Sequence, residues 1–307
     1  MNRDQLSRRH FIQSAAVTAG ALLLSPGKLL RAADPVKRTA TDIVELGKTG
    51  IKLSRLGIGT GINNGAENLQ LGKAEFVKVL RHAMDQGITY IDCAQRYATF
   101  DVVKEAIAGV PREKLFIQTK IWPGDVKDAM SGIDAHRKNF NTDYIDSMLI
   151  HCRTEGKWTD IDKAYMDAYA EAQQKKWIRA KGVSCHSKEA LDQAAKVDWA
   201  DTHLVRVNPQ GILVDGPNGG WPNTVPNPVQ PVVDQIKIMH DKGRGVIGMK
   251  IFGNGFIKDP AEREKSVRFA MSNSSINAIV IGMSSAEQID QNIKLINKVL
   301  SELPAPA

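Results

Sequence analysis

Short apolar runs alternate with longer amphipathic stretches along nearly the whole chain beyond its N-terminal segment. In the stretch 73–86, Phe76, Val79 and Leu80 fall on one helical face, and Gly87 follows at the end. Strands that alternate with helices predict a parallel sheet, and about eight repeats of the unit predict closure into a barrel. The sequence therefore predicts an α/β fold, the (β/α)8 or TIM barrel.

The other expected helices show the same periodicity and span residues 100–108, 126–140, 161–176, 188–195, 229–241, 261–272 and 286–303. The expected strands are short apolar runs at 56–59, 90–92, 115–120, 144–151, 180–184, 204–207, 246–249 and 278–281. An open, doubly wound sheet is the alternative arrangement of such units. No G-x-G-x-x-G sequence follows the first expected strand, so we favour the closed barrel.

The composition predicts a single large domain. With 307 residues, of which 42% are hydrophobic, the chain is long enough for one extensive core, and we expect one barrel over residues 41–307. The formal net charge of +7 comes from scattered Lys and Arg side chains and not from a basic run interleaved with aromatic residues. Nucleic acid is therefore not an expected partner.

Residues 1–40 have the pattern of a leader and linker. Arg8 and Arg9 precede an apolar run at 15–24, which is followed by Pro26. This order resembles a twin-arginine (Tat) export signal, with a chance Arg-Arg pair before an amphipathic helix as the alternative. The apolar run is shorter than the roughly 20 residues of a spanning helix, so we expect no permanent membrane anchor. The pattern predicts a periplasmic or otherwise exported protein, with the Tat machinery as a partner.

Three expected strands lead into polar side chains of complementary chemistry. Asp92 and Tyr97 lie in TYIDCAQRY, Lys120 ends LFIQTK, and His151 ends YIDSMLIH. Because parallel strands end at one rim, these four groups can meet in a single mouth. A phenol acid, a cation, a carboxylate and an imidazole suit the reduction of a carbonyl group. Taken singly, a strand-end cap, a solvated lysine and a satisfied core histidine are the alternatives.

These residues, in this order on successive strands, resemble the catalytic tetrad of the aldo-keto reductase superfamily. The resemblance runs from about Val44 to Leu300 and implies a β-hairpin around residues 47–50 that closes the barrel bottom. It implies hydride transfer between NADP or NAD and a small carbonyl compound or alcohol, sugars included, with Tyr97 as general acid or base. Lys120 would favour ionisation of the Tyr97 phenol.

The resemblance also implies which residues hold the nicotinamide end of the cofactor. They lie at expected strand ends and are Gly59, Thr60, Gly61, Ser184, Cys185, Arg206, Met249 and Lys250. Three depart from the family pattern: Cys185 replaces the usual Asn, Arg206 lies near the usual Gln, and Met249 replaces the usual Tyr. We therefore expect altered contacts to the carboxamide and a less rigid packing partner for the ring.

The sequence IGMSSAEQIDQN resembles the adenosine-phosphate clamp of the family. The matching residues are Gly282, Ser284, Ser285, Gln288 and Asn292. Ser284 stands where many members have an arginine for the 2′-phosphate, which weakens the expected preference for the phosphorylated cofactor. Lys250 could compensate if it points toward this end, and the resemblance itself favours NADP over NAD.

A long irregular stretch, residues 209–228, follows the expected strand 204–207 and is rich in Gly, Pro and Asn. Loops of this length in compact domains are usually functional or disordered. We interpret it as a lid on the substrate or cofactor side, with Trp221 as the candidate substrate contact. A tryptophan that merely anchors the loop to the barrel is the alternative.

Cys93, Cys152 and Cys185 each lie beside an expected strand end. An odd number of cysteines cannot form a fully paired disulfide framework. No C-x-x-C or H-x-E spacing orders them as ligands, so we expect no metal site and interpret them as small, partly buried thiols. A metal or redox site at this rim is the alternative.

Two classes of function remain open from the sequence. The intact tetrad favours an enzyme, whereas the departures at the cofactor positions favour a non-catalytic barrel that retains a nicotinamide cofactor to sense a ligand or redox state. We expect the enzyme. Since free nicotinamide cofactor is scarce outside the cytoplasm, export implies either a tightly bound cofactor that is recycled in place or a limited turnover.

Overall fold

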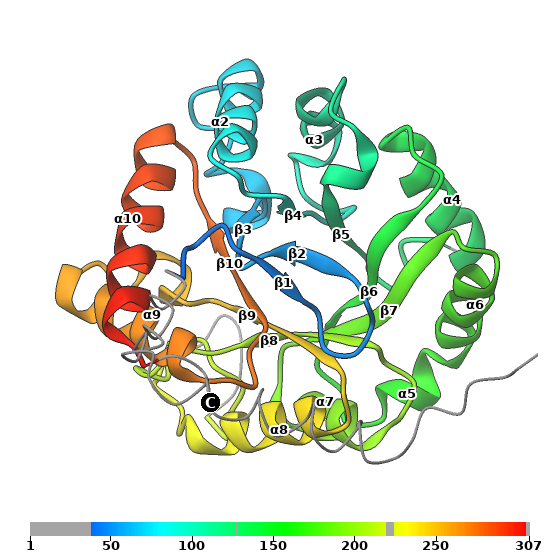
Figure 1. Cartoon of the computed structure of the whole chain (residues 1–307). Helices are drawn as coiled ribbons and strands as arrows, with labels where there is room; N and C mark the ends of the chain where they lie inside the picture. The colour runs from blue at the N-terminus through cyan, green and yellow to red at the C-terminus, as the bar shows by residue number, and fades with distance from the viewer. Residues whose placement is uncertain (1–37, 127, 219–223, 305–307) are drawn as a thin grey trace, which may run out of the picture. The chain divides into compact units, whose positions relative to one another are not determined.

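Eight parallel strands form a closed barrel in this computed structural model, which describes residues 38–126, 128–218 and 224–304 (Figure 1). In order around the barrel they are β10 (Ala278–Gly282), β3 (Leu56–Gly59), β4 (Tyr90–Asp92), β5 (Phe116–Ile121), β6 (Ile145–Arg153), β7 (Ile178–Cys185), β8 (Thr202–Arg206) and β9 (Gly245–Met249). Pairing of β9 with β10 completes the circle. The predicted (β/α)8 barrel is confirmed, and the open sheet is excluded.

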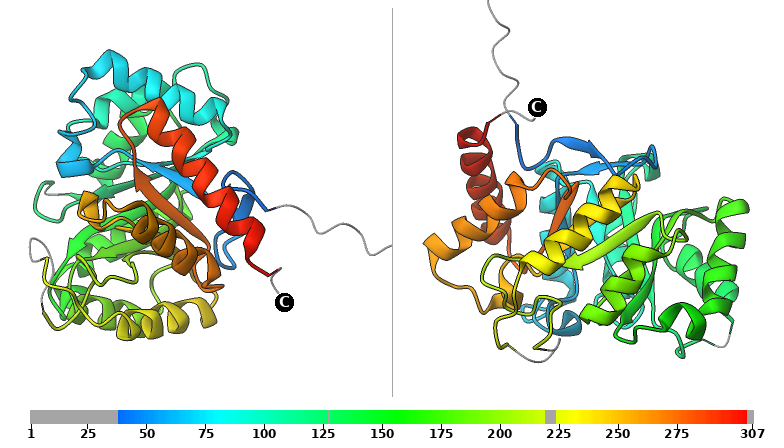
Figure 2. Two further views of the ribbon diagram at one scale, coloured as in Figure 1. Left: turned by 90° about the vertical axis from the view of Figure 1, so that its left-hand side faces the viewer. Right: turned by 90° about the horizontal axis from the view of Figure 1, so that it is seen from below.

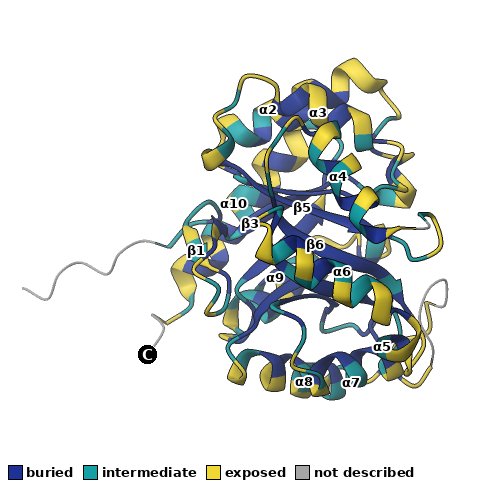
Figure 3. Cartoon of the chain, turned by 90° about the vertical axis from the view of Figure 1, so that its right-hand side faces the viewer, coloured by how far each residue is buried: buried dark blue, intermediate teal, exposed yellow. Residues whose placement is uncertain are grey.

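Helices surround the strands (Figures 1 and 2). They are α2 (Lys73–Asp85), α3 (Phe100–Ile107), α4 (Ala129–Asn139), α5 (Trp158–Ile161), α6 (Lys163–Gln174), α7 (Lys188–Lys196), α8 (Gln230–Asp241), α9 (Pro260–Ser272) and α10 (Ala286–Glu302), with 3-10 turns η1 (Ile62–Gly65), η2 (Arg112–Lys114) and η3 (Gly253–Gly255). Figure 3 shows the buried residues on the strands and inner helix faces, and the exposed residues on the outer faces. The apolar stripe predicted for 73–86 is buried in α2.

The predicted hairpin lies across one end of the barrel (Figure 1). Its strands, β1 (Ile43–Glu45) and β2 (Lys52–Ser54), pair antiparallel. Leu46, Ile51 and Leu53 are buried in one apolar cluster with barrel-lining residues such as Phe116 and Ile247. This packing closes the amino-terminal end of the barrel, so the carboxyl-terminal end is left for a site.

One expected helix, 161–176, begins two residues later than predicted, as α6 at Lys163, and a separate short helix, α5, ends at Ile161 just before Asp162. The carboxylate of Asp162 is 2% exposed and accepts two hydrogen bonds from Arg153 Nη1, at 2.9 and 3.1 Å. A buried carboxylate needs such a partner, and this ion pair holds Asp162 inward at the break. Residue Arg153 itself lies on β6, which continues two residues beyond the strand end expected at His151.

The N-terminal leader predicted for residues 1–40 falls almost wholly on residues 1–37, which lie outside the described residues. Within the described part of the chain, no helix is both long and apolar enough to span a membrane.

His136 on α4 supports a stability prediction. Its ring is 1% exposed, lies 3.0 Å from Thr119 Oγ1 through Nδ1 and packs edge-on against Phe100. Burial lowers the pKa of His136 to about 3. Between that value and about 6.5 the unfolded chain binds a proton here that the folded chain does not, so the free energy of unfolding falls as the pH falls through this window.

We therefore expect His136→Leu to flatten the acid dependence of stability by about 1.4 kcal/mol per pH unit between pH 6 and 4. Urea denaturation at a series of pH values measures the slope. The exposed His240→Leu is the matched control and should leave the slope close to that of the wild type. An unchanged slope in His136→Leu would contradict the assigned burial.

Candidate active site

The last inward-facing positions of the barrel strands carry most of the predicted site. Side chains alternate in and out along a strand, so Asp92 points inward two residues after Tyr90, and Lys120 two residues after Gln118. His151 follows the inward-facing Leu149 in the same way on β6, and Tyr90 and Leu149 belong to the apolar cluster inside the barrel. The strand period therefore places three of the four tetrad groups at one end of the barrel lumen.

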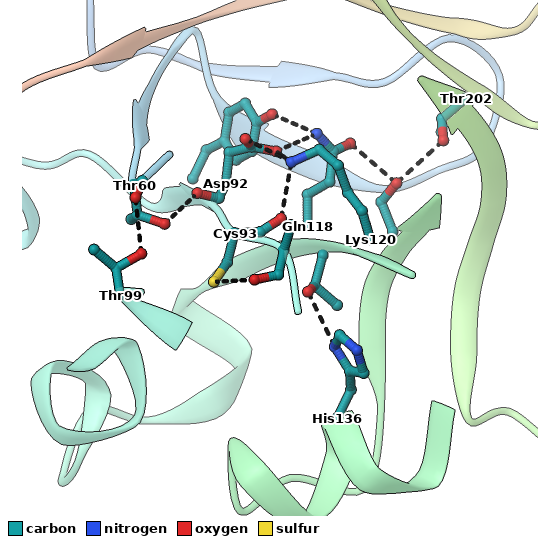
Figure 4. Close-up of polar contacts among 12 residues, drawn as sticks. Thr60, Asp92, Cys93, Thr99, Gln118, Lys120, His136 and Thr202 are labelled. Carbon is teal, nitrogen blue, oxygen red and sulfur yellow. Dashed lines mark hydrogen bonds and ion pairs between the residues drawn. The ribbon is translucent and has the colours of Figure 1, made fainter. Parts of the chain in front are cut away.

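Lys120 and Asp92 form an ion pair inside the barrel (Figure 4). Lys120 Nζ donates to both carboxylate oxygens of Asp92 at 2.7 Å and to the carbonyl oxygen of Cys93 at 2.8 Å. The Lys120 side chain is only 1% exposed. All three ammonium protons thus have acceptors, which is what a buried charge requires.

A second side chain, Gln118, supports this pair from beneath. Its Nε2 donates to Asp92 Oδ1 at 2.8 Å and to the Tyr90 hydroxyl at 2.7 Å. Its Oε1 accepts from Ser147 Oγ at 3.1 Å, and Ser147 in turn lies 3.1 Å from Thr202 Oγ1. A polar layer built from four strands therefore fixes the Asp92 carboxylate, and Figure 4 shows this chain of contacts.

Tyr97 lies in the turn after β4 and stands over the ion pair. Lys120 Nζ lies 5.2 Å from the centre of the Tyr97 ring. The ring covers Gly61 so closely that a Cβ atom there would lie 2.3 Å from it. Gly61 is therefore required for the ring to take this position, and any larger residue would displace the phenol.

His151 completes the tetrad. Its ring centre is 5.8 Å from that of Tyr97 and 5.9 Å from that of Trp122, with edge-on geometry in both cases. Burial lowers the pKa of His151 well below its ordinary value, and the nearby cations, Lys120 and Arg96 foremost, lower it further. The imidazole is therefore neutral at pH 7 and can donate a hydrogen bond without carrying charge.

The protein raises the pKa of the Tyr97 phenol well above its usual range, first through burial and then through the Asp92 carboxylate. These two effects therefore outweigh the bias toward the phenolate that the sequence predicts for Lys120. The reason is that Lys120 is fully committed to Asp92 and the Cys93 carbonyl. The phenol stays protonated at neutral pH and is in the form that can donate a proton.

A cavity of about 350 Å³ opens from this end of the barrel. Asp92 and Tyr97 line it, as do eight of the residues predicted to bind the cofactor: Gly59, Gly61, Met249, Lys250, Gly282, Ser284, Gln288 and Asn292. The cavity runs from the tetrad to α10. It joins the predicted nicotinamide end to the predicted adenosine end.

The five other predicted cofactor residues, Thr60, Ser184, Cys185, Arg206 and Ser285, do not line this cavity. Thr60 Oγ1 donates to the Asp92 carbonyl oxygen at 2.9 Å, which ties β3 to β4. Ser285 caps α10 by accepting from Gln288 N at 3.2 Å. Thr60 and Ser285 therefore make contacts that stabilise the fold, which the sequence did not indicate.

Arg206 is fully buried beside the lumen and is paired with a residue that the sequence did not single out. Its guanidinium donates to Asp215 Oδ1, which lies in the loop after β8. Burial raises the pKa of Asp215, while Arg206 opposes the shift. Arg206 Nη1 and Ser184 Oγ are buried polar atoms without a hydrogen-bond partner among the described residues. Such atoms normally have a partner, which can be a ligand.

Lys250 points to the catalytic end of the cavity. Its backbone is left-handed (φ +58) and its ammonium donates to Asn254 Oδ1 at 2.8 Å. Burial lowers the pKa of Lys250 to about 8, and the positive charges of Arg206 and Lys120 lower it in the same direction. Because these cations lie at the barrel lumen, Lys250 does not supply the positive charge that is missing at Ser284.

Eleven of the residues that line the cavity were not singled out in the sequence, and the charged or aromatic ones among them are Glu67, Phe252, Lys258 and Arg263. They lie in the loop after β3, the loop after β9 and on α9. No motif marked these positions, because loop residues reach the cavity only through the three-dimensional course of the chain. The only feature of the sequence that could have indicated one of them is a basic residue, Lys258, in the loop after an expected strand.

The three cysteines are free thiols. Burial raises the pKa of Cys93 to about 12 and raises those of Cys152 and Cys185 as well. Thiols of this kind are poor nucleophiles at neutral pH. Among the residues that the structure describes, no group of three or more His, Cys, Asp or Glu side chains is arranged to hold a metal ion.

The long loop after β8 is described except at residues 219–223, so Trp221 lies outside the described residues. Of its described parts, residues 213–216 are buried, whereas residues 217–218 and 224–226 are exposed. Leu213 and Val214 are fully buried, and Asn227 Nδ2 donates to the Val214 carbonyl oxygen at 2.9 Å. None of the described residues from 209 to 228 lines the cavity.

Comparison with known families identifies the relationship. A model of the aldo/keto reductase family matches residues 55–267, more than half of the chain. The chain belongs to the aldo/keto reductase family. This confirms the resemblance that the tetrad motifs indicated, and the tetrad lies within the matched segment.

Individual members of the aldo/keto reductase family are similar over part of the chain. Methylglyoxal reductase DkgB from Salmonella typhimurium is 31% identical over 137 residues, which cover 42% of this chain and 51% of the relative. Glycerol 2-dehydrogenase (NADP(+)) from Hypocrea jecorina is 36% identical over 115 residues, covering 34% of this chain and 33% of the relative. The chain thus spans about half or less of the length of these relatives.

Solved aldo-keto reductases share the fold. The holo form of a Bacillus halodurans enzyme has a TM-score of 0.65 at 15% identity and covers 87% of this chain and 97% of its own. A Klebsiella pneumoniae enzyme in complex with NADP and acetate has a TM-score of 0.63 at 18% identity, with coverage of 88% and 92%. These likenesses agree with the closed barrel described above.

The Lys120–Asp92 pair generates a stability prediction. Lys120→Met leaves a buried carboxylate without its cation, which we expect to lower the free energy of unfolding by about 3–5 kcal/mol. Lys163→Met, which removes an exposed partner of Asp167, is the control and should cost less than about 1 kcal/mol.

Chemical denaturation of both variants at pH 7 makes the comparison. Adding Asp92→Asn to Lys120→Met should restore part of the loss, because the uncompensated charge is removed. A Lys120→Met protein as stable as Lys163→Met would contradict the buried ion pair.

Proposed function

We propose that this chain is an NAD(P)-dependent oxidoreductase that transfers hydride between a nicotinamide cofactor and a small carbonyl compound or alcohol. The observation that carries the proposal is a protonated phenol, Tyr97, at a cavity whose inner end also holds the buried Lys120–Asp92 pair. His151 lies beside the phenol. Membership of the aldo/keto reductase family supports the same reaction.

The chemistry divides between cofactor and protein. A bound reduced nicotinamide would supply a hydride to the carbonyl carbon, and a bound oxidised one would accept a hydride in the reverse direction. Tyr97 donates its proton to the carbonyl oxygen as negative charge grows there. His151, kept neutral by its surroundings, orients that oxygen through a hydrogen bond. The Lys120 ammonium, 5.2 Å from the Tyr97 ring centre, stabilises the phenolate that proton donation leaves behind.

The residues at the barrel lumen fit a nicotinamide cofactor. The unpartnered Ser184 Oγ and Arg206 Nη1 are hydrogen-bonding groups of the kind that a carboxamide takes up. Met249 lines the cavity and offers a thioether surface to an aromatic ring. Gly59, Gly61 and Gly282 line another part of the cavity and have no side chains to fill it, so the cavity stays open toward α10. These features support cofactor binding despite the altered residues.

The residues around the site and the activities named for the similar proteins both support small carbonyl substrates. Trp122 lies beside His151, and the Arg96 guanidinium lies 4.1 Å from the centre of the Trp122 ring. The similar proteins include methylglyoxal reductases and glycerol 2-dehydrogenases. We propose short aldehydes, ketones and sugar-related alcohols as the substrate class. A non-catalytic sensing barrel has no support from the comparisons, and the assembled tetrad argues against it.

Tyr97→Phe tests the proposal directly. We expect it to lower kcat for NADPH-dependent reduction of methylglyoxal at least 1000-fold, because general acid catalysis and the oriented proton are both lost. Cofactor Kd, measured by quenching of protein fluorescence, should change less than about threefold. Absorbance at the nicotinamide band follows turnover.

Tyr144→Phe is the matched control, since the Tyr144 ring stacks under Arg112 on the outside of the barrel. It should retain wild-type activity. Equal activity in Tyr97→Phe and Tyr144→Phe, or wild-type protein that binds neither NADP nor NAD, would overturn the proposed function.

We further propose that residues 1–40 direct export by the Tat route and that residues 41–307 form the exported barrel. The support is the sequence alone: Arg8 and Arg9 precede an apolar run that is too short to span a membrane. The Tat route carries folded proteins, which suits a chain that must acquire its cofactor before export. NADP or NAD would then travel bound to the barrel.

The export proposal predicts that Arg8→Lys/Arg9→Lys keeps the protein in the cytoplasm of a Tat-competent bacterium. Immunoblots of periplasmic and cytoplasmic fractions measure the distribution. Arg3→Lys is the control and should leave export intact. Unchanged periplasmic accumulation of the double variant would refute the assignment.

A further inference from the structure

One cation at the outer end of the cavity has no role in the reaction proposed above. Arg263 lies on the first turn of α9 and lines the cavity together with Asn292 of α10. Asn292 lies seven residues beyond Ser285, the N-cap of α10, which is about 10 Å along the helix. Arg263 is therefore at the outer ring of helices, far from the lumen that holds the tetrad.

The Arg263 guanidinium is held in place by two contacts. It lies over the Phe252 ring with 4.3 Å between Cζ and the ring centre, and its Nη2 donates to Asn292 Oδ1 at 2.9 Å. Its Nε is a buried donor without a hydrogen-bond partner among the described residues. A fixed, partly dehydrated guanidinium with a spare donor is suited to bind an oxyanion.

The charges that line this end favour an anion. Lys258, which is exposed, follows Phe252 along the same loop and lines the same cavity. Glu67 is the only acidic residue besides Asp92 among those that line the cavity, and Asp92 is neutralised by Lys120. Arg263 and Lys258 therefore give the outer end a positive charge that a phosphate can match.

Ser284 does not provide this charge. Gln288 Oε1 accepts from Ser284 N at 2.9 Å and lies 3.3 Å from Ser284 Oγ, so Gln288 already occupies both of its donors. A dinucleotide with its nicotinamide beside Tyr97 must extend outward through the cavity, and its adenosine ribose then lies toward α9 and α10. The phosphate that reaches farthest in this direction is the 2′-phosphate of NADP.

Resting on the proposed function, we propose that Arg263, assisted by Lys258, binds the 2′-phosphate of the adenosine ribose and makes the protein selective for NADP over NAD. The guanidinium that the loop after β10 lacks is thus supplied from α9. Phe252 fixes its plane and is positioned to face the adenine side of the ligand.

Binding of adenosine fragments tests this subsite apart from catalysis. Isothermal titration of the full chain should show tighter binding of adenosine 2′,5′-bisphosphate than of 5′-AMP. Arg263→Ala should weaken NADP binding about tenfold to a hundredfold and NAD binding less than about threefold, because one charge-assisted contact to the 2′-phosphate is lost. Lys258→Ala should act in the same direction with a smaller effect.

Two further variants keep the test interpretable. Arg268→Ala removes a guanidinium from the same helix that is paired with Glu264 and Glu302, and it should leave both affinities unchanged. Arg263→Lys keeps the positive charge and should recover part of the NADP affinity. Circular dichroism of each variant shows whether the barrel is intact.

The outcomes separate this inference from the proposed function. If Arg263→Ala weakens NADP and NAD equally, the residue contacts the pyrophosphate and the inference is overturned, while the oxidoreductase proposal stands. The same holds if the wild type binds both fragments alike. If the wild type binds neither dinucleotide, the proposed function fails together with the inference.

Discussion

The buried ion pair between Lys120 and Asp92 is the interaction on which the site depends. An ammonium that is 1% exposed must have acceptors for its protons, and the structure provides both oxygens of one carboxylate and a backbone carbonyl. Gln118 donates to the same carboxylate from below. The pair is thereby fixed by β4 and β5 together, and the position of Tyr97 above it follows from the turn that leaves β4.

The electrostatics around this pair decide which protonation states the other groups adopt. Burial and the nearby cations lower the pKa of His151 and keep its ring neutral. Burial and the Asp92 carboxylate raise the pKa of Tyr97. Both groups therefore hold a proton that they can share with an oxygen atom. The site differs in this from one whose resting state holds a phenolate.

The sequence predicted the fold and tetrad because both depend on strong local patterns. Strand and helix periodicity located all eight units, and polar residues at strand ends marked Asp92, Lys120 and His151. The pattern could not show which side chains pair with each other. The Arg153–Asp162 ion pair lies where α5 ends and α6 begins, and Arg206, a predicted cofactor residue, is paired with Asp215. These contacts join residues nine positions apart through loops whose course has no sequence signature.

The most direct test of the account is a crystal structure of the protein with NADP and a carbonyl-containing inhibitor. The account predicts the nicotinamide ring at the inner end of the cavity beside Met249, and the inhibitor oxygen within about 3 Å of the Tyr97 hydroxyl and the His151 ring. A cofactor bound elsewhere, or an inhibitor oxygen that contacts neither side chain, would contradict it.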